Sequence, residues 1–367
     1  MMKIGIPQEV MTGEGRIALT PDACKTLINE GNVIFLQKNA GCESGYFDED
    51  YEKSGVSIVE NAQALYQQAD LIIKVKQPLA QDLDCLRSHH VLFSYLHLAA
   101  DVDLIQRLCQ IGLTAIPFES ISDETHALPL LAPMSQVAGR ISVMRGASLL
   151  FRNQGGRGVL LGGVDGSDVG RVLVLGAGIA GSSAVDVAVG LGAKVDVVDL
   201  NHARLQSLKE CYPDIEVHLS TPQVVADLSK QADLVIGAVL LAGRRAPVVL
   251  SKSMVEKMPD GSVIIDIAID QGGCVEGIRI TDSEELFYRE QGVLHSAVPN
   301  MPAAVARTAS QSLSSAILPY VLALTCSKLN AWQTSPDARI KALYQARAVH
   351  QGAVVDYVLK TELDSAV

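Results

Sequence analysis

The amino-acid sequence predicts an α/β fold with two Rossmann-like, doubly wound domains built on parallel sheets. The chain has 367 residues, about twice the length of a typical domain. Short apolar runs alternate with longer amphipathic stretches almost from the first residue, which is typical of parallel sheets flanked by helices. A glycine-rich strand-to-helix turn near residue 176 is typical of a nucleotide-binding unit of this class.

The first part of the chain predicts one α/β domain of about 130 residues. Residues 3–6 form the opening strand. Thr20 followed by Pro21 predicts a helix start, because threonine caps a helix and proline fits its first turn, and Gly31 predicts the helix end. Further strands are expected at residues 33–36, 71–75, 91–96 and 113–118.

A glycine-dense stretch over residues 153–170 predicts a loop, and a second α/β unit follows it. Residues 300–325 and 338–360 are expected to be helical, and the end of the chain is expected to return to the first domain. Five strands separated by helices are expected in the second unit, at residues 172–175, 195–198, 215–219, 234–239 and 263–267.

The charge balance argues against nucleic-acid and membrane partners. Lys and Arg total 30 against 41 Asp and Glu, so the net charge is −11. A surface this acidic repels phosphate backbones and anionic lipid headgroups, because both are bound through clustered Lys and Arg. The apolar stretch 316–324 contains Pro319 and is far shorter than the ~18 to 20 residues that a bilayer requires.

The cysteines and the N-terminus predict a cytoplasmic protein without a metal site. The seven cysteines are an odd number, are widely spaced and include no C-x-x-C pair, which excludes a disulfide framework and a zinc site. Reduced, mostly buried thiols are expected instead. No signal peptide is expected, because the chain reaches Pro7 before an apolar segment could form.

Residues 172–181 contain the strongest local motif, a strand that runs into Gly-x-Gly-x-x-Gly and then into a helix. Gly176 would permit the tight turn, Gly178 would let the backbone approach a pyrophosphate, and Gly181 would let helix and strand pack closely. The phosphates would then lie at the helix N-terminus, where unpaired N–H groups favour negative charge. The glycines alone also fit an ordinary turn; the strand, loop and helix in register favour a dinucleotide site.

An acidic residue at the end of the next strand predicts which dinucleotide binds. Asp199 lies 18 residues after Gly181. A carboxylate at this position accepts hydrogen bonds from both ribose hydroxyls and repels a 2′-phosphate. The expected cofactor is therefore NAD rather than NADP.

Four further ionisable residues lie at the ends of predicted strands or in the first loop. Asp270 ends an apolar strand before Gln-Gly-Gly, and ligands of open α/β sheets bind outside such carboxyl ends. Arg16 offers a bidentate fork for a carboxylate, Lys76 a point charge for a carbonyl oxygen, and His97 a proton donor near neutral pH. Each also fits an ordinary role as a turn residue, a solvated charge or a structural histidine.

Several segments of the chain are more specific than the glycine motif, and through them the chain resembles the alanine dehydrogenase family. That family shares its architecture with the NAD-binding component of proton-translocating transhydrogenase. The resemblance covers residues 2–325, and the segments that match are 5–9 (GIPQE), 14–21 (EGRIALTP), 74–78 (KVKQP), 96–99 (LHLA), 128–135 (LPLLAPMS), 155–158 (GGRG), 266–273 (DIAIDQGG) and 300–302 (NMP).

The resemblance implies NAD-dependent, reversible oxidative deamination of L-alanine to pyruvate and ammonium by hydride transfer. It implies that Arg16 binds the substrate carboxylate, that Lys76 contacts this carboxylate and the reacting carbonyl, and that His97 and Asp270 are the catalytic pair. The motif and the resemblance together imply an NAD site lined by Ser135, Gly176, Gly178, Ile179, Ala180, Gly181, Asp199, Arg204, Ser220, Val239, Leu240, Ile267, Asp270, Arg279, Val298, Asn300 and Met301.

The resemblance also implies a domain organisation and an assembly. Residues 1–130 plus 306–367 would form the substrate domain, and residues 131–305 the NAD-binding Rossmann domain, with the active site in the interdomain cleft. The expected partners are the small molecules L-alanine, pyruvate and ammonium, with no nucleic acid and no membrane. The chain is expected to form a homo-oligomer, and the expected oligomer is a hexamer.

The chain departs from the family pattern, and two other functions remain open. Gly15 stands where the family often has an aromatic residue, which is expected to loosen the loop that carries Arg16; Gln136, Ser296 and Ala306 also differ. One alternative function is an NAD(H)-binding module of a membrane proton-translocating transhydrogenase. The other is a dehydrogenase for another small amino acid.

Overall fold

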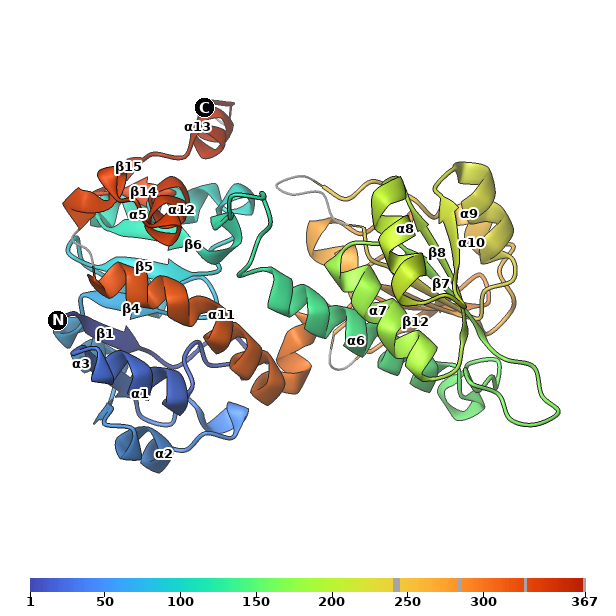
Figure 1. Cartoon of the computed structure of the whole chain (residues 1–367), viewed down its shortest axis with the longest axis horizontal. Coiled ribbons are helices and arrows are strands. Elements are labelled where there is room, and N and C mark those ends of the chain that lie inside the picture. The colour runs from blue at the N-terminus through green and yellow to red at the C-terminus, as the bar shows by residue number, and fades with distance from the viewer. Residues whose placement is uncertain (240–244, 283–284, 327–328, 366–367) are drawn as a thin grey trace. The chain divides into compact units, whose positions relative to one another are not determined.

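The computed structural model describes residues 1–239, 245–282, 285–326 and 329–365 (Figure 1). The chain divides into two compact units, each with its own sheet. Unit 1 comprises Met1–Met134 and Ala303–Val367, and unit 2 comprises Ser135–Pro302. The last part of the chain therefore belongs to the same unit as the first.

The sheet of unit 1 consists of the strands β1 (Lys3–Ile6), β2 (Val33–Gln37), β3 (Ser57–Val59), β4 (Leu71–Ile73), β5 (Val91–Ser94), β6 (Thr114–Pro117), β14 (Val349–His350) and β15 (Ala353–Val354). Their order across the sheet is β15-β14-β6-β5-β4-β1-β2-β3, and all pairs from β6 to β3 are parallel. The chain order reverses between β1 and β4. Ligands of open α/β sheets bind outside the carboxyl ends of the strands at such a reversal.

Helices cover both faces of this sheet. One face packs on helices α1, α11 and α12 through core residues such as Ile4 and Phe93, and the other packs on α3 and α5 through Ile72 and Leu92. Strands buried on both faces need the continuous apolar runs that the sequence shows. Figure 1 shows α11 along its face of the sheet. The helices of unit 1 are α1 (Pro21–Asn29), α2 (Asp48–Lys53), α3 (Ala62–Gln68), α4 (Ala80–Cys85), α5 (Val102–Ile111), α11 (Ala306–Cys326), α12 (Ala338–Gln345) and α13 (Tyr357–Ser365).

The sheet of unit 2 consists of the strands β7 (Arg171–Leu175), β8 (Lys194–Asp199), β9 (Glu216–Leu219), β10 (Leu234–Gly237), β11 (Val263–Asp266), β12 (Tyr288–Glu290) and β13 (Val293–Ser296). Their order is β12-β13-β11-β10-β7-β8-β9, and all pairs from β13 to β9 are parallel. The chain order reverses between β7 and β10, so unit 2 repeats the plan of unit 1.

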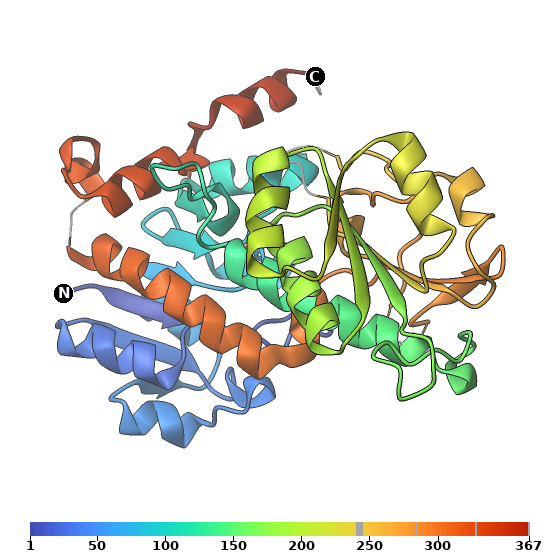
Figure 2. The same ribbon diagram turned by 45° about the vertical axis from the view of Figure 1, so that its right-hand side comes forward.

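Two apolar cores sandwich the second sheet. One core joins helices α6, α7 and α8 to strand residues such as Val174 and Ile236, and the other joins α9 and α10 to Leu173 and Val235. Figure 2 shows α6 and α7 on the same side of this sheet. The helices of unit 2 are α6 (Ala132–Leu149, which begins at the end of unit 1), α7 (Ile179–Gly190), α8 (His202–Cys211), α9 (Pro222–Ser229) and α10 (Lys252–Val255).

The predicted fold class is confirmed, because both units are doubly wound α/β structures with mainly parallel sheets. The predicted strands are present with ends shifted by a few residues. The helix expected over residues 300–325 begins at Ala306, after a 3₁₀ turn over Met301–Val305.

The prediction of one helix over residues 338–360 is wrong. Helix α12 ends at Gln345, and a hairpin of β14 and β15 follows before α13 begins. The turn of this hairpin is Gln351-Gly352, with φ angles of 49° and 80°. Two positive φ angles give a two-residue turn the twist that antiparallel strands need. The β12–β13 hairpin, which the sequence analysis also missed, turns at Gln291-Gly292 with φ angles of 51° and 79°.

The seven cysteines are free thiols, as predicted, but the expectation that most are buried is wrong. Three of the exposed or part-exposed cysteines are the last residues of α4, α8 and α11. The ends of these helices lie at the surface of the protein. The presence of a cysteine in the sequence does not show whether it stands at such an end. Cys24 and Cys274 are buried, Cys42, Cys85 and Cys109 are part-exposed, and Cys211 and Cys326 are exposed.

The described residues contain neither a membrane-spanning helix nor a cluster of metal ligands. No described helix combines the length and the apolar character needed to cross a membrane. No three His, Cys, Asp or Glu side chains among those residues are grouped so that they could hold a metal ion.

Leu313 tests the contribution of α11 to the core of unit 1. Its side chain is 0% exposed, while Gln311 on the same helix is exposed. The substitution Leu313→Ala is expected to lower the free energy of unfolding by about 2 to 5 kcal/mol, because it leaves a cavity. Gln311→Ala is expected to change it by less than about 0.5 kcal/mol. Urea unfolding of both variants measures this, and equal effects would contradict the packing described here.

Candidate active site

Four ionisable side chains follow four neighbouring strands of unit 1. Arg16 lies in the loop after β1, Lys76 after β4, His97 after β5 and Glu119 after β6. Since these strands are adjacent and parallel, the four loops lie at one edge of the sheet. Lys76 and Arg16 both lower the pKa of His97. The structure therefore brings the three predicted side chains of unit 1 within electrostatic range of one another.

The guanidinium of Arg16 is buried and paired with Glu14, and both residues are less than 5% exposed. Its Nε donates to Glu14 Oε1 at 2.7 Å and its Nη2 to Glu14 Oε2 at 2.6 Å. Glu14 thus occupies the side-on fork that Nε and Nη2 form. A ligand carboxylate could be bidentate only at the Nη1–Nη2 edge, where Nη1 lies 3.0 Å from the sulfur of Met134.

Hydroxyl groups from helix α11 hold the loop that carries Arg16. The backbone N–H of Ile17 donates to Ser310 Oγ at 2.9 Å, and the N–H of Thr20 donates to Ser314 Oγ at 3.0 Å. The two serines are four residues apart, so they lie on one face of the helix. The C-terminal part of unit 1 therefore helps to position a residue near the N-terminus.

Hydrogen bonds support the backbone at Gly15, where the sequence predicts a looser loop. Ser44 Oγ donates to the Gly15 carbonyl at 2.6 Å and lies 2.8 Å from Ser310 Oγ. A Cβ on Gly15 would lie 2.8 Å from Glu43 Oε2. Glu43 thus occupies the space that a larger residue at position 15 would need.

Glu9 holds the loop that carries Lys76. Its Oε1 accepts the N–H of Val75 at 2.6 Å, and its Oε2 accepts the N–H of Lys76 at 3.3 Å. Burial raises the pKa of the Glu9 carboxyl, while the charge of Lys74 and the N–H groups lower it. The buried Lys74 ammonium lies 3.7 Å from Glu9 Oε2 and 3.2 Å from Asp82 Oδ2. The ion pair with Lys74 therefore stabilises the Glu9 carboxylate.

His97 has an unusual backbone conformation for a bulky residue. Its φ and ψ are 50° and 38°, the left-handed region. Its N–H donates to Glu119 Oε1 at 2.6 Å, and its ring stacks with that of Tyr95 at a centroid distance of 6.2 Å. Desolvation, then the charges of Lys76 and Arg16, lower the pKa of His97 from 6.5 to about 4. The residue is exposed as a whole, and the two nearby cations favour the neutral imidazole.

In unit 2 the Gly-x-Gly-x-x-Gly segment forms the turn from β7 into α7. Gly176 has a φ of 105°, and a Cβ there would lie 2.7 Å from the carbonyl oxygen of Ala238. A Cβ on Gly181 would overlap the Gly176 carbonyl, so only glycine permits this approach of α7 to the turn. At Gly178 a Cβ would have no described atom within 4 Å. The open backbone at the start of α7 fits a bound pyrophosphate.

The Asp199 carboxylate lies beside this turn. Its Oδ2 accepts the N–H of Ala177 at 2.6 Å and its Oδ1 accepts the N–H of Asn201 at 2.7 Å. Asp199 therefore links the end of β8 to the glycine turn after β7. A carboxylate here is in the position that recognises the adenosine ribose in this class of fold.

Most other residues predicted for the NAD site also follow the strands of unit 2. The N–H of Ser220, after β9, donates to the Asp199 carbonyl at 2.9 Å. Leu240 lies outside the described residues. The remaining ones are Ile179 and Ala180 at the start of α7, Val239 after β10, Ile267 after β11, and Val298, Asn300 and Met301 after β13.

Three predicted residues, Ser135, Arg204 and Arg279, have other surroundings. Ser135 begins unit 2 within the first turn of α6. Arg204 is exposed in the first turn of α8. Arg279 is exposed, pairs with Glu285 at 2.9 Å and lies 3.9 Å from the centre of the Tyr288 ring. None of these contacts joins the residue to the turn.

Asp270 is exposed in a 3₁₀ turn over Ile267–Gln271 at the carboxyl end of β11. The fully buried Asp266 shapes this turn, because its carboxylate accepts the N–H groups of Ala268 at 2.9 Å and Cys274 at 2.8 Å. Burial raises the pKa of Asp266, and these N–H groups lower it. The structure thus places Asp270 in unit 2 and His97 in unit 1.

The sequence analysis missed the carboxylates that hold the charged loops in place. Glu9 and Glu14 stand within segments quoted for the family resemblance, and Glu119 follows the predicted strand 113–118. A strand end followed by an acidic residue was the available signal. It was not decisive, because sequence spacing does not show which backbone N–H groups a carboxylate will reach.

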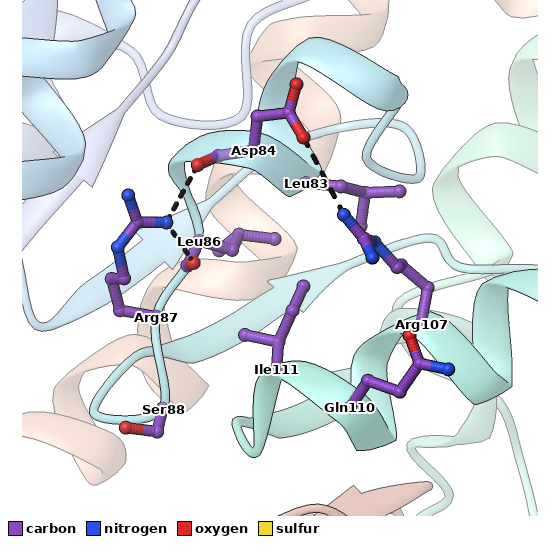
Figure 3. Close-up of a pocket in the computed structure, with 8 residues that line it drawn as sticks. All are labelled: Leu83, Asp84, Leu86, Arg87, Ser88, Arg107, Gln110 and Ile111. Carbon is purple, nitrogen blue, oxygen red and sulfur yellow. Dashed lines mark hydrogen bonds and ion pairs between the residues drawn. The ribbon is translucent and has the colours of Figure 1, made fainter.

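A cavity of about 340 Å³ lies elsewhere on unit 1 (Figure 3). Apolar side chains of Leu83, Leu86 and Ile111 line it, and Asp84 bonds or pairs with both Arg87 and Arg107. The lining loops precede β5 and β6, so the cavity lies at the amino ends of these strands. Ligands of open α/β sheets bind at the opposite edge, so we do not assign the substrate to this cavity.

Comparisons with known proteins agree over most of the chain. A family model described as "Alanine dehydrogenase/PNT, N-terminal domain" matches residues 5–138, and one described as "Alanine dehydrogenase/PNT, C-terminal domain" matches residues 142–357. Alanine dehydrogenase of Bacillus subtilis (strain 168) is 43% identical over 353 residues, which are 96% of this chain and 90% of that protein.

Two solved structures are also similar. A structure titled L-alanine dehydrogenase superposes with a TM-score of 0.95 and 41% identity over 100% of both chains. A transhydrogenase from Sinorhizobium meliloti superposes with a TM-score of 0.83 and 25% identity, over 97% of this chain and 99% of that chain.

Alanine substitutions at two glycines of this turn are expected to have different effects, one on stability and one on NADH binding. Gly181→Ala is expected to lower the melting temperature, because the new Cβ overlaps the Gly176 carbonyl and such overpacking typically costs about 1 to 3 kcal/mol. Gly178→Ala is expected to leave the melting temperature unchanged and to weaken NADH binding about tenfold or more, through the loss of close backbone approach. Thermal unfolding and NADH fluorescence titration measure both; full NADH affinity in the Gly178 variant would exclude this turn as the pyrophosphate site.

Proposed function

The chain belongs to the alanine dehydrogenase/PNT family, and on this basis we propose that it catalyses reversible, NAD-dependent oxidative deamination of L-alanine to pyruvate and ammonium. The observation that carries the proposal is the relatives named alanine dehydrogenase, which are 41–43% identical over 88–96% of the chain. The cluster of Arg16, Lys76 and His97 at one sheet edge supports it chemically.

In this proposal unit 2 binds the cofactor. The open backbone at Gly178 and the first turn of α7 would hold the pyrophosphate, and Asp199 would bind the adenosine ribose and select NAD over NADP. When bound, NAD supplies the hydride acceptor for alanine oxidation and NADH the hydride donor for the reverse reaction. The remaining predicted residues at the strand ends of unit 2 would line this site.

The charged groups of unit 1 would act on the substrate. Arg16 would bind the carboxylate through its Nη1–Nη2 edge, since Glu14 already holds the other side. Lys76 would bind the carboxylate and polarise the carbonyl oxygen of pyruvate. Such fixed charges orient the substrate and stabilise the developing negative charge on that oxygen.

His97 and Asp270 would move the protons. A neutral imidazole at His97 can accept the proton of the hydroxyl group when the carbinolamine collapses to pyruvate, and it returns that proton in the reverse reaction. Asp270 would position the attacking water or ammonia and assist its deprotonation. The two residues belong to different units, so the proposal requires that both units act on one substrate molecule.

Two alternatives make distinct predictions. The similarity to a transhydrogenase structure keeps an NAD(H)-binding module open, and such a module would need no amino-acid substrate. A dehydrogenase for glycine, serine or a related oxo acid would retain the chemistry and change the substrate. The higher identity to proteins named alanine dehydrogenase favours the first proposal.

The proposal extends to assembly and location. We expect a cytoplasmic homo-oligomer, a hexamer as the family resemblance implies, that works on small molecules. The net charge of −11 and the free thiols support this expectation, since acidic proteins avoid nucleic acid and free thiols suit a reducing compartment.

A coupled assay with the purified protein tests the reaction. NADH absorbance is expected to fall when pyruvate and ammonium are both present, and to remain constant when either is omitted. NADPH is expected to support little turnover, because Asp199 repels a 2′-phosphate. A panel of small oxo acids distinguishes the substrate alternatives. NADH binding without ammonium-dependent turnover on any of them would instead support the binding module.

The charges around His97 predict a pH effect. Desolvation, Lys76 and Arg16 lower the pKa of His97 to about 4, so the imidazole is neutral at pH 7 in the ligand-free protein. Lys76→Met removes one positive charge, and the pKa of His97 is expected to rise toward 6.5. Diethylpyrocarbonate attacks neutral imidazole, so the pH midpoint of His97 modification should move upward.

The matched control for this measurement is Lys25→Met, which removes an exposed lysine from α1 and should leave the midpoint unchanged. His97→Ala identifies the signal of His97 among the eight histidines. An unchanged midpoint in the Lys76 variant would mean that the two side chains are too far apart in solution to interact.

A further inference from the structure

We propose that Glu119 is the positioning residue of His97: its carboxylate holds the His97 backbone in the left-handed conformation and thereby aims the imidazole. This inference rests on the proposed acid–base role of His97. Glu119 is not assigned a contact with the substrate. Its effect on the reaction would pass entirely through His97.

The first observation is the backbone conformation of His97. The left-handed region is costly for a residue with a large side chain and persists only where the surroundings impose it. Gln291 and Gln351, which also have positive φ, lie in the tight turns of two hairpins that require it. His97 lies instead between strand β5 and a 3₁₀ turn over Leu98–Ala100, so another interaction must hold it.

The second observation is that Glu119 binds two successive backbone N–H groups at this position. The N–H of Leu96 lies 3.1 Å from Glu119 Oε1 and 3.3 Å from Oε2, and the N–H of His97 lies 2.6 Å from Oε1. These bonds fix the two peptide planes that precede the Cα of His97, and anion-binding turns of successive N–H groups contain a residue in the left-handed conformation. The carboxylate and the left-handed conformation therefore stabilise each other.

The third observation is that the imidazole of His97 and the side chain of Phe118, which precedes Glu119 in the chain, pack against the same ring, that of Tyr95. Phe118 is fully buried and packs edge-on against Tyr95 at 5.0 Å, which fixes the adjacent Glu119. The hydroxyl of Tyr95 donates to the Leu130 carbonyl at 2.5 Å. The ring of His97 stacks with Tyr95 at an interplanar angle of 17°. Any movement of the His97 backbone would therefore shift the imidazole off this ring.

The charge of Glu119 suits this role. Burial raises the pKa of its carboxyl, while the N–H groups that it accepts and the nearby charge of Lys76 lower it. An ionised carboxylate offers only acceptors, so both N–H groups can be satisfied at once. A glutamine of the same shape could place its oxygen at the Oε1 position, but a neutral amide is a weaker acceptor than a carboxylate, and its N–H₂ group would replace Oε2, which lies 3.3 Å from the N–H of Leu96.

The experiment compares Glu119→Gln with two reference variants. Glu119→Gln is expected to lower kcat for the reductive amination of pyruvate by about tenfold to a hundredfold, through misplacement of the imidazole, and to leave the KM for NADH unchanged. Glu124→Gln, which changes an exposed carboxylate in the same loop, is expected to leave kcat unchanged. His97→Ala is expected to lower kcat by at least about a hundredfold.

The double variant decides whether Glu119 acts through His97. Because His97 is then absent, Glu119→Gln is expected to cause no further loss of kcat in the His97→Ala background. Additive losses would overturn the proposal, as would wild-type kcat in Glu119→Gln beside a strongly impaired His97→Ala. Near-normal kcat in His97→Ala would instead remove the acid–base role of His97, and with it the proposed mechanism on which this inference rests.

A measurement of stability covers the case in which Glu119→Gln does not fold. Glycine adopts the left-handed conformation at little cost, so His97→Gly should remove the need for Glu119. The Glu119→Gln, His97→Gly protein is therefore expected to fold, and Glu119→Gln should lower the unfolding midpoint less in this background than in the wild type. An equal loss of stability in both backgrounds would show a general structural role and overturn the proposal.

Discussion

Carboxylates that accept backbone N–H groups just beyond the strand ends are the interaction on which the rest of this structure depends. Glu14 accepts the N–H of Arg16, Glu9 that of Lys76 and Glu119 that of His97. Asp199 and Asp266 do the same for the turns of unit 2. A buried carboxylate without partners is costly, whereas charge-assisted hydrogen bonds are strong. Each loop is therefore held in the one arrangement that satisfies its carboxylate.

The two units share one topology but present different chemistry at the same edge of the sheet. The loops of unit 1 present cationic side chains and an imidazole, which suit a small anionic substrate. The first loop of unit 2 presents backbone N–H groups, because Gly178 leaves the main chain open to a ligand while Gly176 and Gly181 permit the tight turn and the close approach of α7. The side chains and backbone groups in these loops account for the different roles that the proposed reaction gives to the two units.

The loop that carries Arg16 depends on residues that are far apart in the chain. Ser310 and Ser314 on α11 bond to the Arg16 loop across 293 and 294 residues of sequence. Glu14 meanwhile pairs with Arg16 only two residues away. Removing one partner of such a buried pair typically costs about 3 to 5 kcal/mol, because the other charge is left without compensation. Local and distant contacts thus fix the same guanidinium.

Apolar periodicity and glycine spacing are local signals, and they were sufficient to predict the fold class, most of the strands, the glycine turn and the candidate side chains Arg16, Lys76, His97, Asp199 and Asp270. They did not reveal the two Gln-Gly hairpins, since Asn-Gly and Asp-Gly are the commoner signals for such turns. Three contacts are visible in the folded chain alone: Glu14 occupies the fork of Arg16, Glu119 accepts the N–H of His97, and α11 supports the first loop. A carboxylate in a sequence does not specify which N–H groups the folded chain brings to it, whether the partner lies two residues away, as for Glu14, or in another loop, as for Glu119.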